Sequence, residues 1–263
     1  MLNGLTNVNV ELTSRCNKTS CFMCGRRKIE RVYPELAQWG DMDYEMVKSI
    51  SEQLPKGIVV QFHDNGEPLL YPRLGEALAL FTGQIRCMDT NGKLLVEKAE
   101  EIIGNLDTIT ISVFEGDVEA DEQYGIVYEF LEKKGARKPK VIIRHLGNTK
   151  YVYLQRHWNI LHAHRQFHSP MGSYGYTKPP TIPEIGICLD ALSHLVIKRD
   201  GKVAMCVRFD PTGLGIIGDM NKESLDEIWN GAKRKLALKF HIKGERHLLP
   251  LCKACSYWGI ATG

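Results

Sequence analysis

The segment VNVELTSRCNKTSCFMC, residues 8–24, joins a β-like run to three closely spaced cysteines. Residues 8–13 are predicted to form a strand, and Cys16, Cys21 and Cys24 follow it in a loop. Three thiolates in nine residues can bind three irons of a 4Fe–4S cluster and leave the fourth iron open to a chelating ligand. A zinc site that uses Cys21 and Cys24 is the alternative interpretation.

Strand-like and helix-like segments alternate from residue 7 to about residue 165. Asp43 is a candidate N-cap of the first helix. The order predicts βα units around a parallel sheet, and so an α/β fold. After the first strand, the predicted strands are 57–63, 85–88, 107–114 and 141–145, and the predicted helices are 45–54, 73–81, 95–103 and 119–134.

In a barrel of such units, alternate side chains of each strand point inward. Polar residues are predicted at the inward positions of several strands, which suggests a cavity lined for a ligand. A core filled by mutually hydrogen-bonded groups is the alternative. The predicted inward residues are Gln61, His63, Thr108, Thr110, Ser112 and Arg144.

Four more cysteines, Cys188, Cys206, Cys252 and Cys255, lie in the last third of the chain. Two β-like runs, 194–198 and 202–207, flank an Asp-Gly pair, which predicts a hairpin, and a single helix is expected over 223–240. These thiolates can converge on one iron–sulfur cluster or on the zinc of a four-cysteine ribbon. The spacing of the cysteines alone does not distinguish an iron–sulfur cluster from zinc. Cys87 lies on a predicted strand and is expected to be a small core residue.

The chain has 263 residues, of which 43% are hydrophobic, which is enough for one core or one core with a small added domain. Its 34 basic and 31 acidic residues give a net charge of +3, which indicates neither a nucleic-acid nor a membrane partner. No apolar run is long enough for a membrane span, and the N-terminus lacks the features of a signal peptide. We therefore expect a cytoplasmic protein, whose reduced cysteines bind metal rather than form disulfides.

The cysteine triad after the first strand resembles that of the radical S-adenosylmethionine (SAM) superfamily, although C-x4-C-x2-C is one residue longer than the usual C-x3-C-x2-C. Residues 64–68, Asp-Asn-Gly-Glu-Pro, are similar to the family's G-G-E-P motif, and Thr-Asn-Gly at 90–92 also stands in the expected order. The resemblance implies a partial (β/α)6 TIM-like barrel. It also implies that SAM is held by Met23, Asn65, Gly66, Glu67, Asn91, Ser112 and Arg144. Glu67 would meet the SAM ammonium group, Ser112 the ribose and Arg144 the carboxylate.

The C-terminal cysteines resemble the twitch module, the short form of the SPASM extension of radical SAM proteins. This implies an auxiliary 4Fe–4S cluster bound by all four thiolates, within a small β-hairpin and helix module. The expected domains are the barrel at 1–165, a connector at 166–187 and the module at 188–263. No role is assigned to the histidines and tyrosines in and around the connector, which are His145, His157, His162, His164, His168, Tyr174 and Tyr176.

The resemblance implies a radical SAM oxidoreductase that uses SAM and two 4Fe–4S clusters, with an external electron donor such as flavodoxin or ferredoxin. The cysteine spacing is most similar to that of the 2-deoxy-scyllo-inosamine dehydrogenase type, which implies net oxidation of a sugar- or cyclitol-like molecule. The first strand begins near residue 7, which leaves no room for an N-terminal peptide-recognition domain. A peptide maturase that works with a separate recognition protein remains an alternative, as does a zinc-binding module for protein interaction.

Overall fold

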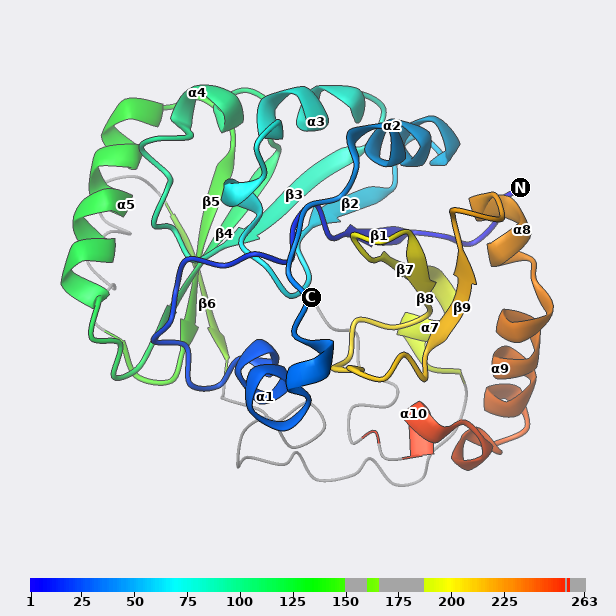
Figure 1. Ribbon diagram of the computed structural model, residues 1–263. Helices are drawn as coiled ribbons and strands as arrows, with labels where there is room; N and C mark the ends of the chain where they lie inside the picture. The colour runs from blue at the N-terminus through cyan, green and yellow to red at the C-terminus, as the bar shows by residue number, and fades with distance from the viewer. Residues whose placement is uncertain (150–159, 166–186, 254, 256–263) are drawn as a thin grey trace.

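One mixed β-sheet runs through the chain in the computed structural model, which describes residues 1–149, 160–165, 187–253 and 255 (Figure 1). The strand order is β6-β5-β4-β3-β2-β1-β7-β8-β9. Strands β1 to β7 pair in parallel, and β8 and β9 are antiparallel. The strands are β1 (Asn7–Val10), β2 (Val59–Phe62), β3 (Ile85–Thr90), β4 (Thr108–Phe114), β5 (Lys140–Leu146), β6 (Leu161–Arg165), β7 (His194–Ile197), β8 (Lys202–Ala204) and β9 (Ile216–Asp219).

The α/β prediction is confirmed, and so is the partial barrel. Among the described strands, β6 and β9 form the two edges and the sheet does not close. Within the described part of the chain, no helix has the length and apolar character needed to cross a membrane.

Helices α2 to α5 lie along the outer side of the parallel strands, and α8 and α9 lie beside β9 (Figure 1). Between the helices and the sheet, apolar side chains such as Val60, Phe62 and Ile111 are fully buried. The helices are α1 (Gly25–Val32), α2 (Tyr44–Gln53), α3 (Leu74–Leu80), α4 (Ala99–Ile102), α5 (Ala120–Lys134), α7 (Leu189–Ser193), α8 (Leu225–Trp229), α9 (Ala232–Ile242) and α10 (Pro250–Lys253).

Local signals account for several helix boundaries. The carboxylate of Asp43 accepts the N–H of Glu45 over 2.8 Å, which confirms the predicted N-cap of α2. The single helix predicted over 223–240 is wrong, because α8 and α9 are separate helices joined at Asn230 and Gly231. Gly231 has an extended backbone conformation at the N-cap of α9, and a Cβ there would lie 3.0 Å from a carbonyl of the preceding turn.

The structure adds elements that the sequence pattern did not indicate. Helix α1 begins directly after Cys24, but its mostly charged surface buries only Arg26 and Ile29. Strand β6 lies outside the predicted strands, and it extends the parallel sheet beyond β5. Helix α7 and strand β9 complete the C-terminal module around the predicted hairpin of β7 and β8.

The strand register confirms the predicted polar interior face. Aligned residues of a parallel ladder point to the same side of the sheet, and residues two apart on one strand do so too. Gln61 is level with Cys87, Asp89 with Thr110, and Ser112 with Arg144. Cys87 therefore belongs to this face and is half-buried rather than a buried core residue.

Candidate functional site

The cysteine triad lies in the loop between β1 and α1. Cys24 is the N-cap residue of α1, and its N–H donates to the carbonyl of Cys21 over 3.2 Å. Burial and the neighbouring Cys24 raise the pKa of Cys21 to about 12, and burial likewise raises the pKa of Cys24, with Cys16 adding to it. Cys16 and Cys24 thus both oppose the ionisation of Cys21, and Cys16 also opposes that of Cys24. Such a set of thiols fits a cationic group like an iron–sulfur cluster, which binds cysteine as thiolate.

The loop that carries Gly66 and Glu67 packs directly on the residues that lead to the triad. A Cβ on Gly66 would lie 2.0 Å from the carbonyl oxygen of Thr13 and 2.8 Å from that of Arg15. The N–H of Glu67 donates to the same Arg15 carbonyl over 2.7 Å. Glycine is therefore required at position 66, because any side chain would push the two loops apart.

The Glu67 carboxylate is fully buried and connects this loop to the carboxyl end of β3. It accepts the hydroxyl of Thr90 and the N–H of Asn91, each over 2.7 Å, and the N–H of Leu69 over 3.1 Å. Burial raises the pKa of Glu67 to about 7, although these three donors oppose the shift. Both oxygens already accept hydrogen bonds within the chain, so the contact of Glu67 with the SAM ammonium group stays a prediction.

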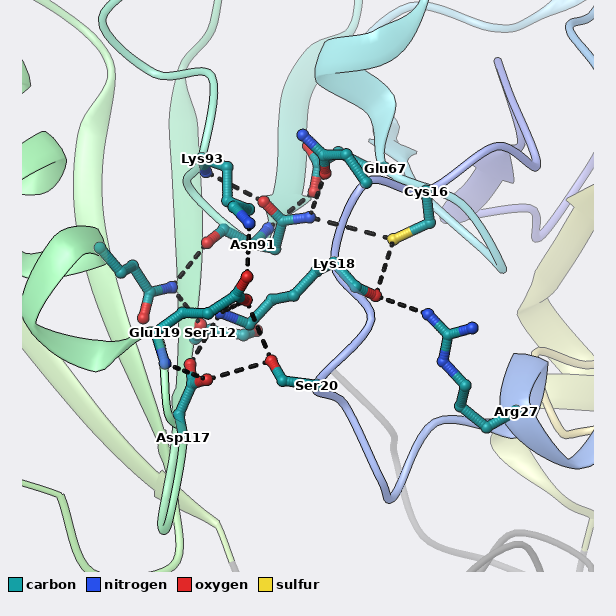
Figure 2. A network of polar contacts seen from close by, with 12 residues as sticks. Cys16, Lys18, Ser20, Arg27, Glu67, Asn91, Lys93, Ser112, Asp117 and Glu119 are labelled. Atoms are coloured by element: carbon teal, nitrogen blue, oxygen red, sulfur yellow. Dashed lines mark hydrogen bonds and ion pairs between the residues drawn. The ribbon is translucent and has the colours of Figure 1, made fainter.

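Asn91 joins the triad to the end of β4 (Figure 2). Its Nδ2 donates to Oδ1 of Asn17 over 2.9 Å and lies 3.9 Å from Sγ of Cys16. The Nε2 of Gln123 donates to the carbonyls of Asn91 and Ser112, over 2.6 and 3.0 Å. Asn91 and Ser112 thus lie beside the cysteine loop, and their contacts with SAM stay predictions. Gln123 was not predicted; the available signal was a lone amide on the apolar stripe of the helix at 119–134.

A buried lysine holds the middle of the cysteine loop (Figure 2). The Nζ of Lys18 lies 2.7 Å from Oδ2 of Asp117 and 3.2 Å from Oε2 of Glu119, and the side chains of Lys18 and Asp117 are each only 1% exposed. The hydroxyl of Ser20 lies within hydrogen-bond distance of both carboxylates, at 3.1 and 3.0 Å, and Lys93 donates to Glu119 over 2.6 Å. Two lysines balance two carboxylates, so the network is electrically neutral. The sequence analysis did not identify any of these residues.

On the interior face, Arg144 forms an ion pair with Asp89 of β3. Oδ1 of Asp89 accepts from Nε2 of Gln61 over 2.7 Å, and Oδ2 lies 3.6 Å from Nε2 of His63. His63 and Arg144, with Arg165 further off, hold the pKa of Asp89 below its usual range despite burial. Asp89 was not predicted as a site residue, and the contact of Arg144 with the SAM carboxylate stays a prediction.

A second polar junction connects the loop that carries Gly66 and Glu67 to the C-terminal module. The backbone N–H and Nδ2 of Asn65 both donate to Oε1 of Glu11 over 3.3 Å, and the N–H of Arg199 donates to Oε2 over 3.1 Å. Lys198 forms an ion pair with Asp64. Burial, reinforced by Asp64, raises the pKa of Glu11 to about 7. Asn65 therefore faces Glu11. Met23, the remaining predicted SAM contact, is half-buried in the turn before α1.

The four C-terminal cysteines line one pocket. Cys188 is the N-cap residue of α7, Cys206 follows β8, and Cys252 and Cys255 lie in and just after α10. Burial raises the pKa of Cys252 to about 12, and Cys188 and Cys255 add to the shift. The set fits a group bound by four thiolates. The pocket is lined by Cys188, Asp190, Ala191, Met205, Cys206, Arg208, His241, Leu251, Cys252 and Cys255.

Three histidines of β5 and β6 lie on the outer side of the sheet, away from the interior face. Nε2 of His145 lies 2.7 Å from Nδ1 of His162, and the ring of His145 stacks on that of His164. Within the ranges 1–149, 160–165, 187–253 and residue 255, no three His, Cys, Asp or Glu side chains are grouped closely enough for a single metal ion. The remaining aromatic residues named above, His157, His168, Tyr174 and Tyr176, lie outside the described residues.

Comparison with known proteins gives these sites a context. Residues 188–256 match the family described as SPASM, an iron–sulfur cluster-binding domain. The structure of BtrN in complex with AdoMet and 2-DOIA matches with a TM-score of 0.68 and 21% identity, over 95% of this chain and 92% of BtrN. The chain shares its fold with BtrN.

SuiB of Streptococcus suis has a similar fold. Its S-adenosylmethionine complex matches with a TM-score of 0.63 and 14% identity, over 96% of this chain and 72% of SuiB. The structure of SuiB bound to the precursor peptide SuiA matches with a TM-score of 0.62 and 14% identity, over 96% of this chain and 71% of SuiB. No curated protein matches the chain in sequence. The predicted resemblance to radical SAM proteins with a SPASM or twitch module is confirmed, and the SPASM match favours a cluster over zinc in the C-terminal pocket.

Proposed function

We propose that this protein is a radical SAM oxidoreductase that removes a hydrogen atom from a sugar- or cyclitol-like small molecule and completes a two-electron oxidation. One observation carries the proposal: two separate sets of cysteines, one of three and one of four, are held on the same sheet. Three thiolates leave one iron of a 4Fe–4S cluster open for SAM, and four thiolates ligate a cluster fully. When bound, the first cluster and SAM supply a 5′-deoxyadenosyl radical.

The residues of the first site would position these groups. Cys16, Cys21 and Cys24 would hold the cluster, and the network around Asn91 places the cysteine loop beside the ends of β3 and β4. SAM would then lie over the carboxyl ends of the strands, where barrel enzymes keep their chemistry. The polar interior face, with Gln61 and His63, would contact the substrate.

The second site supports oxidation rather than a redox-neutral reaction. A cluster held by Cys188, Cys206, Cys252 and Cys255 has no open iron for substrate, which leaves electron transfer as its role. It would accept the electron that remains on the substrate after hydrogen abstraction, while the substrate releases a proton. An external donor such as flavodoxin or ferredoxin would supply the electron that starts each cycle.

Anaerobic reconstitution with iron and sulfide tests this proposal. We expect roughly eight irons per chain, a brown colour, and 5′-deoxyadenosine when dithionite and SAM are added. Replacing Cys16, Cys21 and Cys24 with Ala should abolish 5′-deoxyadenosine formation. A colourless protein that takes up zinc under iron-replete anaerobic conditions would overturn the proposal.

Peptide modification is a second candidate, because SuiB, which was solved with a precursor peptide, shares the fold. Here a separate recognition protein would present the peptide. Genes next to this one separate the candidates: a short precursor peptide favours modification, and sugar-pathway enzymes favour dehydrogenation. Incubation of the reduced enzyme and SAM with the encoded peptide, followed by mass spectrometry, then tests for a loss of hydrogen.

A further inference from the structure

Two arginines point into the barrel from the carboxyl ends of its last two strands. In the ladder between β5 and β6, Arg144 is level with Ala163 and Leu146 is level with Arg165. Aligned residues share a face, and residues two apart on one strand do so too. Arg144 and Arg165 therefore both belong to the interior face, at the end of the barrel where the cysteine loop lies.

One carboxylate faces these two guanidinium groups, and its oxygens are already used. Oδ1 of Asp89 accepts from Gln61, and Oδ2 is shared between Arg144 and His63. Arg165 forms no ion pair or side-chain hydrogen bond with the residues that the structure describes. Among the described residues, the pair is thus one negative charge short of balance.

Arg208 of the C-terminal module also interacts electrostatically with Arg165. Arg208 lines the pocket of the four cysteines, and its N–H donates to Sγ of Cys206 over 3.4 Å. Burial lowers the pKa of the Arg165 guanidinium, Arg144 and Arg208 lower it further, and Asp89 opposes them. Arg165 therefore lies within electrostatic reach of both the barrel interior and the auxiliary pocket.

Half-buried like charges repel each other unless an anion joins them. A guanidinium group binds carboxylate or phosphate through two parallel hydrogen bonds, which makes arginine the usual partner of such groups. We propose that Arg165, on the same interior face as Arg144, binds a carboxylate or phosphate group of the substrate inside the barrel. This inference rests on the proposed function and narrows its substrate to an anionic molecule.

SAM itself also brings a carboxylate, so the test must separate the two sources. The probe is inorganic phosphate, titrated calorimetrically at low ionic strength into the anaerobically reconstituted full chain. SAM is present at saturation without reductant, so that its carboxylate already occupies its own site. We expect one phosphate site, and a Kd raised roughly tenfold or more in Arg165→Gln. Arg31→Gln, which removes an exposed arginine of α1, is the matched control and should bind as the unaltered chain does.

A second variant keeps the test decisive if Arg165→Gln loses its fold or its iron. Asp89→Asn removes the one opposing charge and should tighten phosphate binding several-fold, whereas a purely structural role for Asp89 predicts weaker or unchanged binding. The inference fails if phosphate does not bind in the presence of SAM, if SAM displaces it, or if Arg165→Gln binds it normally. Formation of 5′-deoxyadenosine is measured on the same samples. Its absence, with phosphate binding intact, refutes the proposed function and not the anion site.

Discussion

Replacing Lys18 with Met removes the charge that holds the cysteine loop while keeping the length and apolar stem of the side chain. Oδ1 of Asp117 would keep two donors, the Ser20 hydroxyl and the N–H of Glu119. Oδ2 would lose Lys18, which lies 2.7 Å away, and the carboxylate would stay where only 1% of it is exposed. Glu119 would keep its ion pair with Lys93.

The structure sets the expected size of the effect. Removing one partner of a buried ion pair costs about 3–5 kcal/mol, because the other charge remains in a poorly solvated position. Lys133→Met is the matched control, since Lys133 and Glu100 form an ion pair over 3.3 Å with side chains 40% and 79% exposed. An exposed pair of this kind contributes about 0–1 kcal/mol.

Urea unfolding of the apoprotein at pH 7, followed by circular dichroism, measures the change in the free energy of unfolding for Lys18→Met and for Lys133→Met. In reconstituted protein, Lys18→Met should also lose roughly four of eight irons, because the loop that carries the triad loses its anchor. The double variant Lys18→Met with Asp117→Asn should recover part of the lost stability, since it leaves no buried charge unpaired. A free energy of unfolding within about 1 kcal/mol of the unaltered chain would refute this account of the ion pair.

Three further predictions concern the junctions around the two sites. Gly66→Ala should prevent stable cluster assembly, as measured by iron content, whereas Gly125→Ala, in the middle of α5 with open space around it, should be neutral or stabilising by up to about 1 kcal/mol. Because folding raises the pKa of Glu11 from 4.5 to about 7, the stabilising effect of the Glu11 carboxyl is complete below pH 4.5 and is lost as the pH rises through 7. Glu11→Gln should therefore flatten this fall in the free energy of unfolding, measured in urea. An equal fall in both proteins would contradict the prediction. Cys252→Ala combined with Cys255→Ala should halve the iron content and stop substrate turnover while sparing SAM cleavage, and full turnover would exclude the electron-acceptor role.

The sequence predicted those parts of the fold that depend on nearby residues. The alternation of strands and helices, the Asp43 cap, the interior face and the hairpin of β7 and β8 all follow from short-range patterns. Strand β6 was missed because its residues, Leu-His-Ala-His-Arg, include only two apolar side chains and no β-branched one, and they gain their place from pairing with β5. The split between α8 and α9 was missed because the apolar stripe continues across Gly231.

The residues of the candidate site were likewise predicted only where the signal lies in nearby residues. Cysteines and short motifs are visible in one stretch of sequence, so both cysteine sets could be identified before their geometry was known. The pairing of Lys18 with Asp117, and of Arg144 with Asp89, depends on which strand ends meet in space. Charged residues are common on protein surfaces, and no local pattern marks the few that are buried.

The pairing of β7 with β1 has a consequence for the integrity of the chain. Strand β1 leads into the cysteine loop and lies between β2 and β7, so the C-terminal module covers one of its two hydrogen-bonding sides. A fragment that ends before the module would present β1 as an unprotected edge, open to pairing with the strands of other molecules. Expressed alone, residues 1–165 should therefore aggregate. Pairing with β7 therefore protects the edge of the strand that leads into the cysteine loop.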